Sequence, residues 1–76
     1  MTPEETGDLL GVCAAYDGRK VEPADVMAWY QLIRNLSFTE ARAAVYEHYR
    51  TEIRRIMPAD VIRGCIRPED EWKLNG

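Results

Sequence analysis

Apolar side chains recur at every third or fourth position along most of this chain, which is the spacing of helices that bury one face. No segment shows the strict alternation of apolar and polar residues that is typical of a half-buried strand. Capping residues or prolines stand where the helical spacing begins. The pattern therefore predicts an all-α fold, a small four-helix domain with three main helices and a short C-terminal helix.

The first predicted helix runs from Pro3 to about Ala15. Thr2 can cap this helix, Pro3 suits its first turn, and Glu5 completes a capping box. Residues 17–20 are predicted to form the turn that follows. The expected buried stripe consists of Leu9, Leu10, Cys13 and Tyr16.

The second and third predicted helices carry most of the large apolar side chains. The second begins near Pro23 and ends near Asn35. The third follows another capping box, residues 37–40, and runs from Phe38 to about Thr51. Their expected buried residues are Val26, Trp29, Tyr30 and Ile33 in the second helix, and Phe38, Ala41, Val45 and Tyr49 in the third.

The pattern does not decide whether residues 52–57 extend the third helix or form a loop. Pro58 must start a new element, because the residue before a proline is disfavoured in the helical conformation. Arg67 and Pro68 end the short helix that begins there. This fourth helix is predicted from Pro58 to about Ile66, with Val61, Ile62, Cys65 and Ile66 facing inward.

The 76 residues suffice for one domain, which we divide into a helical domain of residues 1–67 and an acidic tail of residues 68–76. A composition of 46% hydrophobic and 30% charged residues is typical of a globular chain. So short a chain buries only about 60% of the surface that its unfolded form exposes, so we expect marginal stability. The net charge of −3 argues against a molecule that binds nucleic acid through its overall charge.

The two cysteines, Cys13 and Cys65, both fall on predicted apolar stripes, which favours buried thiols in a reducing compartment. A disulfide between them stays open at this level. The sequence has neither an apolar run of the ~20 residues that span a membrane nor an N-terminus of signal-peptide type. We therefore predict a location in the cytoplasm of a bacterial host cell.

The residue types that carry catalysis are sparse. There is no phosphate-binding GxxxxGK[ST] loop, and neither cysteine nor the single histidine, His48, stands at the spacing of a zinc site. The carboxylates are spread over positions that face solvent, without a matched acid–base pair. The sequence thus predicts a protein that is not an enzyme, with no catalytic, cofactor-binding or metal-binding residues and no cofactor.

Arginines are concentrated between residues 42 and 67, where they outnumber the acidic residues. This cluster is either a contact surface for a protein partner or DNA, or a solvated face in which Glu47 pairs with Arg50. Its small net charge predicts weak or no direct DNA binding. Trp72, in the tail, either folds back on the core or anchors a partner. The candidates for partner binding are Arg50, Arg54, Arg55, Arg63, Arg67, Trp72 and Leu74.

Several stretches, in order, resemble the N-terminal helical domain of the phage replicative-helicase loader family, of the loader-and-inhibitor type. The most distinctive are the tryptophan helix around Trp29 and Tyr30 and the stretch from Met57 to Ile62. The resemblance covers about residues 2–66, mostly at core and cap positions. The matching stretches are residues 3–10, 14–16, 21–26, 29–33, 36–41, 44–49 and 57–62.

The resemblance implies an all-helical, non-enzymatic adaptor for phage or prophage DNA replication. Its partner would be a hexameric replicative helicase or a replication initiator. In the family a C-terminal extension binds the helicase, so either that extension lies outside this sequence or the short acidic tail takes its place. Two alternatives remain: a small phage regulator that binds and inhibits a host protein, and a helix-turn-helix-like DNA-binding protein. We rank the DNA reader lowest, because the fourth helix offers few polar side chains that could contact bases.

Overall fold

The computed structural model describes residues 1–65, which form four α-helices and no strand. The predicted all-α fold is therefore confirmed. The tail, residues 68–76, lies outside the described residues, and so does Ile66. The helices are α1 (Pro3–Asp17), α2 (Pro23–Ile33), α3 (Phe38–Thr51) and α4 (Pro58–Cys65).

Local side-chain contacts set the helix starts much as the sequence predicts. The Thr2 hydroxyl accepts a hydrogen bond from the Glu5 N–H (3.1 Å), and a Glu5 carboxylate oxygen accepts one from the Thr2 N–H (2.8 Å). Ser37 Oγ accepts from the Glu40 N–H at 3.0 Å. α1 continues past the predicted end to Asp17, because Gly18 adopts a left-handed conformation (φ 72°) that ends the helix.

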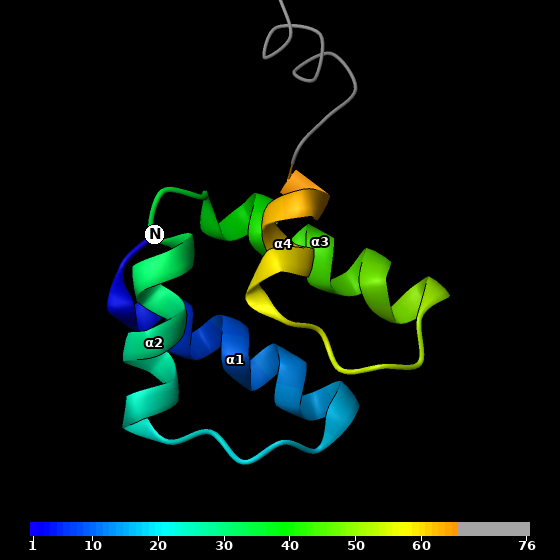
Figure 1. The fold of residues 1–76 in the computed structure, drawn as a ribbon, viewed down its shortest axis with the longest axis horizontal. Helices are drawn as coiled ribbons and strands as arrows, with labels where there is room; N and C mark the ends of the chain where they lie inside the picture. Colours follow the sequence, from blue (N-terminus) through cyan, green and yellow to red (C-terminus); the bar gives the residue numbers. More distant parts are fainter. Residues whose placement is uncertain (66–76) are drawn as a thin grey trace, which may run out of the picture.

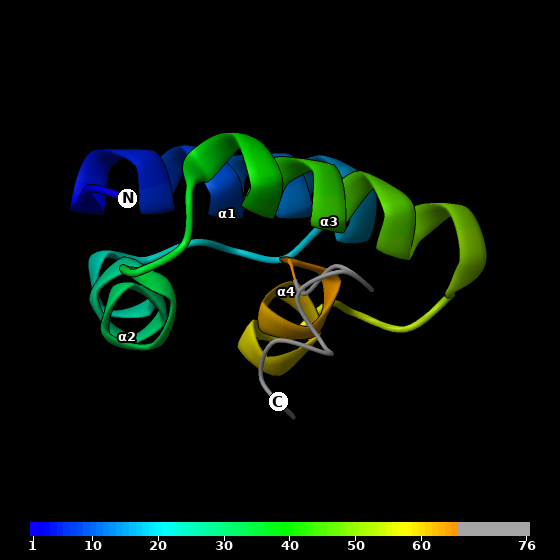
Figure 2. The same cartoon turned by 90° about the horizontal axis from the view of Figure 1, so that it is seen from above.

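The helices form two layers (Figures 1 and 2). α1 and α3 lie side by side in one layer, and α2 and α4 make up the other. α1 packs on α2 and α3, while α4 packs on α3 and α2. The core between the layers consists of Leu9, Leu10, Cys13, Trp29, Ile33, Ala41, Val45, Ile56 and Val61.

α3 and α4 approach each other closely because small residues meet at their contact. A Cβ atom placed on Gly64 would lie only 2.7 Å from the Cβ of Ala44, which is itself buried. The two backbones therefore come nearer than any larger pair of side chains would allow. This contact sets the distance between the helices that border the candidate site.

Two residues predicted to be buried are exposed. Tyr16 is 57% exposed, because it lies in the last turn of α1 and its ring packs on aromatic rings of α3 rather than between the layers. Ile62 is 37% exposed. Its neighbour Val61 points into the core, and successive helical side chains differ in direction by about 100°, so Ile62 falls at the edge.

Residues 52–57 form a loop, which answers the question that the sequence pattern left open. The loop contains a core residue that was not predicted, Ile56, which is fully buried. Cys13 and Cys65 are thiols rather than a disulfide, the first buried and the second half-buried. Burial raises the pKa of the Cys13 thiol to about 11.

Candidate functional site

A polar network holds the loop of residues 52–57 against the ends of α1 and α3. Arg19 donates to Asp17 through both Nε (3.0 Å) and Nη2 (2.7 Å), and the Tyr49 hydroxyl donates to the same carboxylate. Arg19 Nη2 also donates to Ile56 O at 2.8 Å, while the Ile56 N–H donates to the Tyr49 hydroxyl at 3.1 Å. The backbone of Ile56 is thus held from both sides.

This network is charged at neutral pH. The hydrogen bonds from Arg19, and then the one from Tyr49, hold the pKa of Asp17 well below its usual range, although burial acts in the opposite direction. Burial, together with the hydrogen bond to Asp17, raises the pKa of Tyr49. The Arg19 guanidinium also lies 5.4 Å from the ring centre of Trp29, within the range of a cation–π contact.

A second set of contacts joins the same loop to the start of α4. Arg54 donates to both carboxylate oxygens of Asp60, at 2.6 and 2.9 Å, and Asp60 also accepts from the Met57 N–H at 2.9 Å. These bonds, Arg54 first, lower the pKa of Asp60. His48 Nε2 donates to Arg54 O at 2.8 Å. Arg54 and His48 therefore serve the local structure of the loop.

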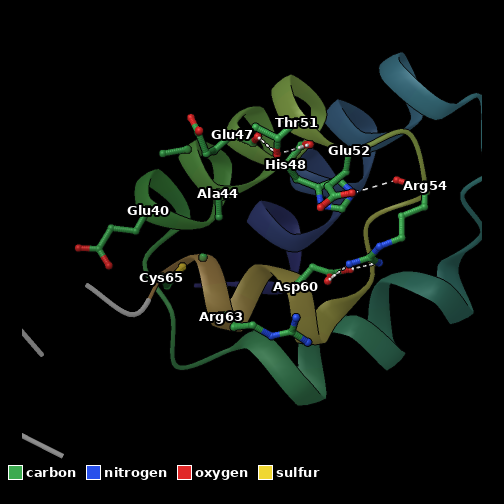
Figure 3. A pocket seen from close by; sticks show the side chains of 12 residues that line it. Glu40, Ala44, Glu47, His48, Thr51, Glu52, Arg54, Asp60, Arg63 and Cys65 are labelled. Atoms are coloured by element: carbon green, nitrogen blue, oxygen red, sulfur yellow. Dashed lines mark hydrogen bonds and ion pairs between the residues drawn. The ribbon is translucent and has the colours of Figure 1, made fainter. Parts of the chain in front are cut away.

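Between α3 and α4 lies a groove of about 620 Å³ (Figure 3). Small residues, among them Ala43, Ala44 and Gly64, line its interior. Glu40 and Glu47 come from the α3 side, and Arg63 comes from the α4 side. The other lining residues are His48, Thr51, Glu52, Arg54, Asp60 and Cys65.

The structure separates the predicted arginines into two groups. Arg50 forms an exposed ion pair with Glu47 (3.5 Å), as one interpretation of the sequence expected, and Arg54 is bound to Asp60. Arg55 and Arg63 are exposed and form no ion pair among residues 1–65. Of the arginines between residues 42 and 65, Arg54 and Arg63 line the groove, and Arg55 lines a second, smaller hollow.

The remaining predicted partner contacts, Arg67, Trp72 and Leu74, lie outside the described residues. Conversely, sequence reasoning missed Ile53, a fully exposed apolar side chain on the loop. It also missed Asp17 as an acceptor for Tyr49. The only hint of that role in the sequence was an acidic residue at a helix end followed by Gly18 and Arg19.

Among residues 1–65, the side chains that line the groove show no arrangement typical of bond cleavage. Within residues 1–65, no three His, Cys, Asp or Glu side chains come together as a metal site would require. His48 is engaged with a backbone carbonyl rather than with a nucleophile. No helix in this part of the chain has the length and apolar character needed to cross a membrane.

Comparisons of this chain with models of known protein families, with curated proteins and with solved structures find no match. The resemblance to phage helicase loaders therefore stays a prediction.

Proposed function

We propose that this protein is a non-enzymatic adaptor of phage or prophage DNA replication, which docks through the groove between α3 and α4 on a hexameric replicative helicase or an initiator. The observation that carries the docking role is the groove itself. Its interior is formed by small residues and its edges by charged ones. The choice of partner rests on the resemblance of the sequence to helicase loaders.

The groove suits a helix or an extended segment of another protein. Small residues such as Ala43 and Gly64 let the backbone of a bound segment come close, as in helix-in-groove recognition. The groove is also preformed, because the Gly64–Ala44 contact sets its width and the Arg54–Asp60 pair closes one end. A preformed surface loses less conformational entropy on binding than a mobile one does.

Arg63 is the arginine on the groove that lacks an ion pair among the described residues. It can therefore pair with a carboxylate of the partner without breaking a contact of its own. The charge of Arg54, by contrast, is already balanced by Asp60. We accordingly assign the partner contact to Arg63 and a structural role to Arg54.

Blocking the groove tests this function. Ala43 is exposed and lines the groove, so Ala43→Tyr should fill part of it while leaving the core intact. Ala28 is another exposed alanine, on α2, and does not line the groove, so Ala28→Tyr is the matched control. We expect Ala43→Tyr to weaken binding to purified host helicase or initiator by about tenfold or more, measured by calorimetry, and Ala28→Tyr to leave it unchanged.

The outcomes separate the docking surface from the partner. If the wild-type chain binds and Ala43→Tyr binds equally well, the contact lies outside the groove. If the wild type binds neither the helicase nor the initiator, the replication role is wrong. The alternative of a regulator that inhibits another host protein then gains support.

A measurement of binding to duplex DNA tests the alternative that the protein is a DNA-binding protein. Arg63 is the only basic residue of α4, and Arg50 and Arg54 are already ion-paired, so little positive charge is available for phosphates. We expect negligible duplex binding near physiological salt. Tight binding that weakens steeply as salt rises would favour the DNA-binding alternative instead.

A further inference from the structure

Ile53 is an apolar side chain presented on a fixed support. It is fully exposed. The adjacent loop residues are held by Arg54–Asp60, by His48 on Arg54 O and by the bonds to the backbone of Ile56. When another protein buries a side chain that a constrained backbone already holds in place, little conformational entropy is lost, so Ile53 can serve as a contact.

A second hollow, of about 220 Å³, is bordered in part by the same loop. Half of its lining is apolar: Leu10 and Trp29 of the core, Val21 and the half-exposed Met57. The other half is charged and consists of Arg19, Lys20, Asp25 and Arg55. Its volume is several times the ~30 Å³ that a water molecule occupies in the liquid. The hollow is therefore large enough for a branched aliphatic side chain.

The hollow and the anchor share one loop. Arg55 and Met57 line the hollow, and Ile53 stands only two residues before Arg55, which is at most about 7 Å along an extended chain. We call the exposed Ile53 side chain the knob and the hollow the hole. A surface that carries both of them this close together is complementary to itself. Two copies related by a twofold axis can each insert the knob into the hole of the other.

The surface also carries an acidic and a basic side chain that can pair between two copies. Glu52 precedes the knob, is exposed and forms no ion pair among residues 1–65. Arg55, at the hollow, is exposed and equally without an ion pair there. The other exposed base of the hollow, Lys20, is already paired with Glu22 at 3.2 Å. In a twofold dimer the Glu52 of each copy can face the Arg55 of the other.

We propose that the chain forms a homodimer through this loop, with Ile53 of each copy in the hollow lined by Trp29 and Met57 of the other. Because both partners contribute the same residues, a single substitution removes two contacts at once. The proposed dimer shares only Glu52 with the groove between α3 and α4, and Ile53, Trp29 and Met57 do not line that groove.

Sedimentation velocity of the full chain over a wide range of concentrations tests the dimer. We expect the wild type to associate, and Ile53→Asp to raise the dissociation constant by about tenfold or more. Met27→Asp, at an exposed methionine of α2 that does not line the hollow, is the control and should associate like the wild type. Circular dichroism checks that all variants are folded. A wild type that stays monomeric throughout, or an Ile53→Asp variant that associates normally, would overturn the proposal.

A charge exchange tests the register of the two copies. Glu52→Arg and Arg55→Glu should each weaken association, because each places like charges opposite one another twice in the dimer. The double variant Glu52→Arg, Arg55→Glu should recover most of the affinity of the wild type. A double variant as weak as the two single changes combined would show that these residues do not face each other, and the proposed register would be wrong.

Discussion

At the scale of single residues, the absence of a side chain matters most where α3 meets α4. Gly64 lies against Ala44, and no larger residue fits between them without moving the helices. Gly11 is a contrasting case, because nothing lies within 4 Å of where its Cβ would be. The two glycines therefore differ in structural role although both are helical.

This contrast gives a pair of opposite predictions. Gly64→Ala should lower the free energy of unfolding by about 1–2 kcal/mol, since the strain of overpacking exceeds the gain in helix propensity. Gly11→Ala should raise it by up to about 1 kcal/mol through propensity alone. Urea denaturation of the two variants measures both. A Gly64→Ala variant as stable as Gly11→Ala would mean that α4 shifts at no cost.

At the scale of elements, the loop between α3 and α4 is anchored by hydrogen bonds to side chains from other parts of the fold. Arg19 reaches it from the connection after α1, and Tyr49 reaches it from the last turn of α3. Arg54 and Asp60 join it to α4. The anchoring explains how an irregular segment can place Ile56 in the core while leaving Ile53 in solvent.

Removing the Tyr49 hydroxyl should loosen this loop. Tyr49→Phe takes a donor from Asp17 and an acceptor from the Ile56 N–H, so we expect a loss of about 1–3 kcal/mol. Tyr30→Phe on half-buried Tyr30, whose hydroxyl has no hydrogen-bond partner among residues 1–65, is the control and should change little. Hydrogen exchange at the Ile56 amide should quicken in Tyr49→Phe. Unchanged exchange there would argue against the anchoring role.

The carboxylates of Asp17 and Asp60, which both hold the loop, contribute to the response of the protein to acid. The folded pKa values of Asp17 and Asp60 lie below the unfolded value of about 3.9. Their stabilising contribution is therefore complete above that pH and is lost as the pH falls through the folded values. We expect the midpoint temperature of thermal unfolding to fall as the pH is lowered below about 4. In Asp60→Asn the drop should be shallower, and an identical pH profile would show that Asp60 does not contribute.

At the scale of the whole molecule, one small core holds four helices together. Trp29 belongs to that core, with 8% of its surface exposed, and Arg19 lies over its ring. So short a chain has little stability to lose, because the surface that it buries is small. The core therefore tolerates few deletions of large side chains.

We expect Trp29→Ala to cost about 3–5 kcal/mol, the usual range for deleting a buried large aromatic residue. A loss of that size should leave the chain largely unfolded at room temperature. Far-UV circular dichroism and thermal melting measure the effect. A cooperative transition near that of the wild type would contradict the central place of Trp29 in the core.

The sequence by itself determined the helices, because their boundaries depend on residues a few positions apart. Thr2 with Glu5 and Ser37 with Glu40 lie within one helical turn, and Pro58 restricts the residue directly before it. The helical spacing of apolar residues also predicted most of the buried face. These interactions are local, so they can be read without knowing how the helices pack.

Only the tertiary structure determined which residues of the loop are buried and which side chains at the candidate site are already paired. Arg19 meets Ile56 and Tyr49 meets Asp17 across 37 and 32 positions of the chain, and residues 52–57 have no helical periodicity from which burial could be predicted. The pairing of Arg54 with Asp60 likewise follows from the turn of the loop before α4. Which arginines remain available for a partner, and which isoleucine faces solvent, therefore depends on packing between distant segments.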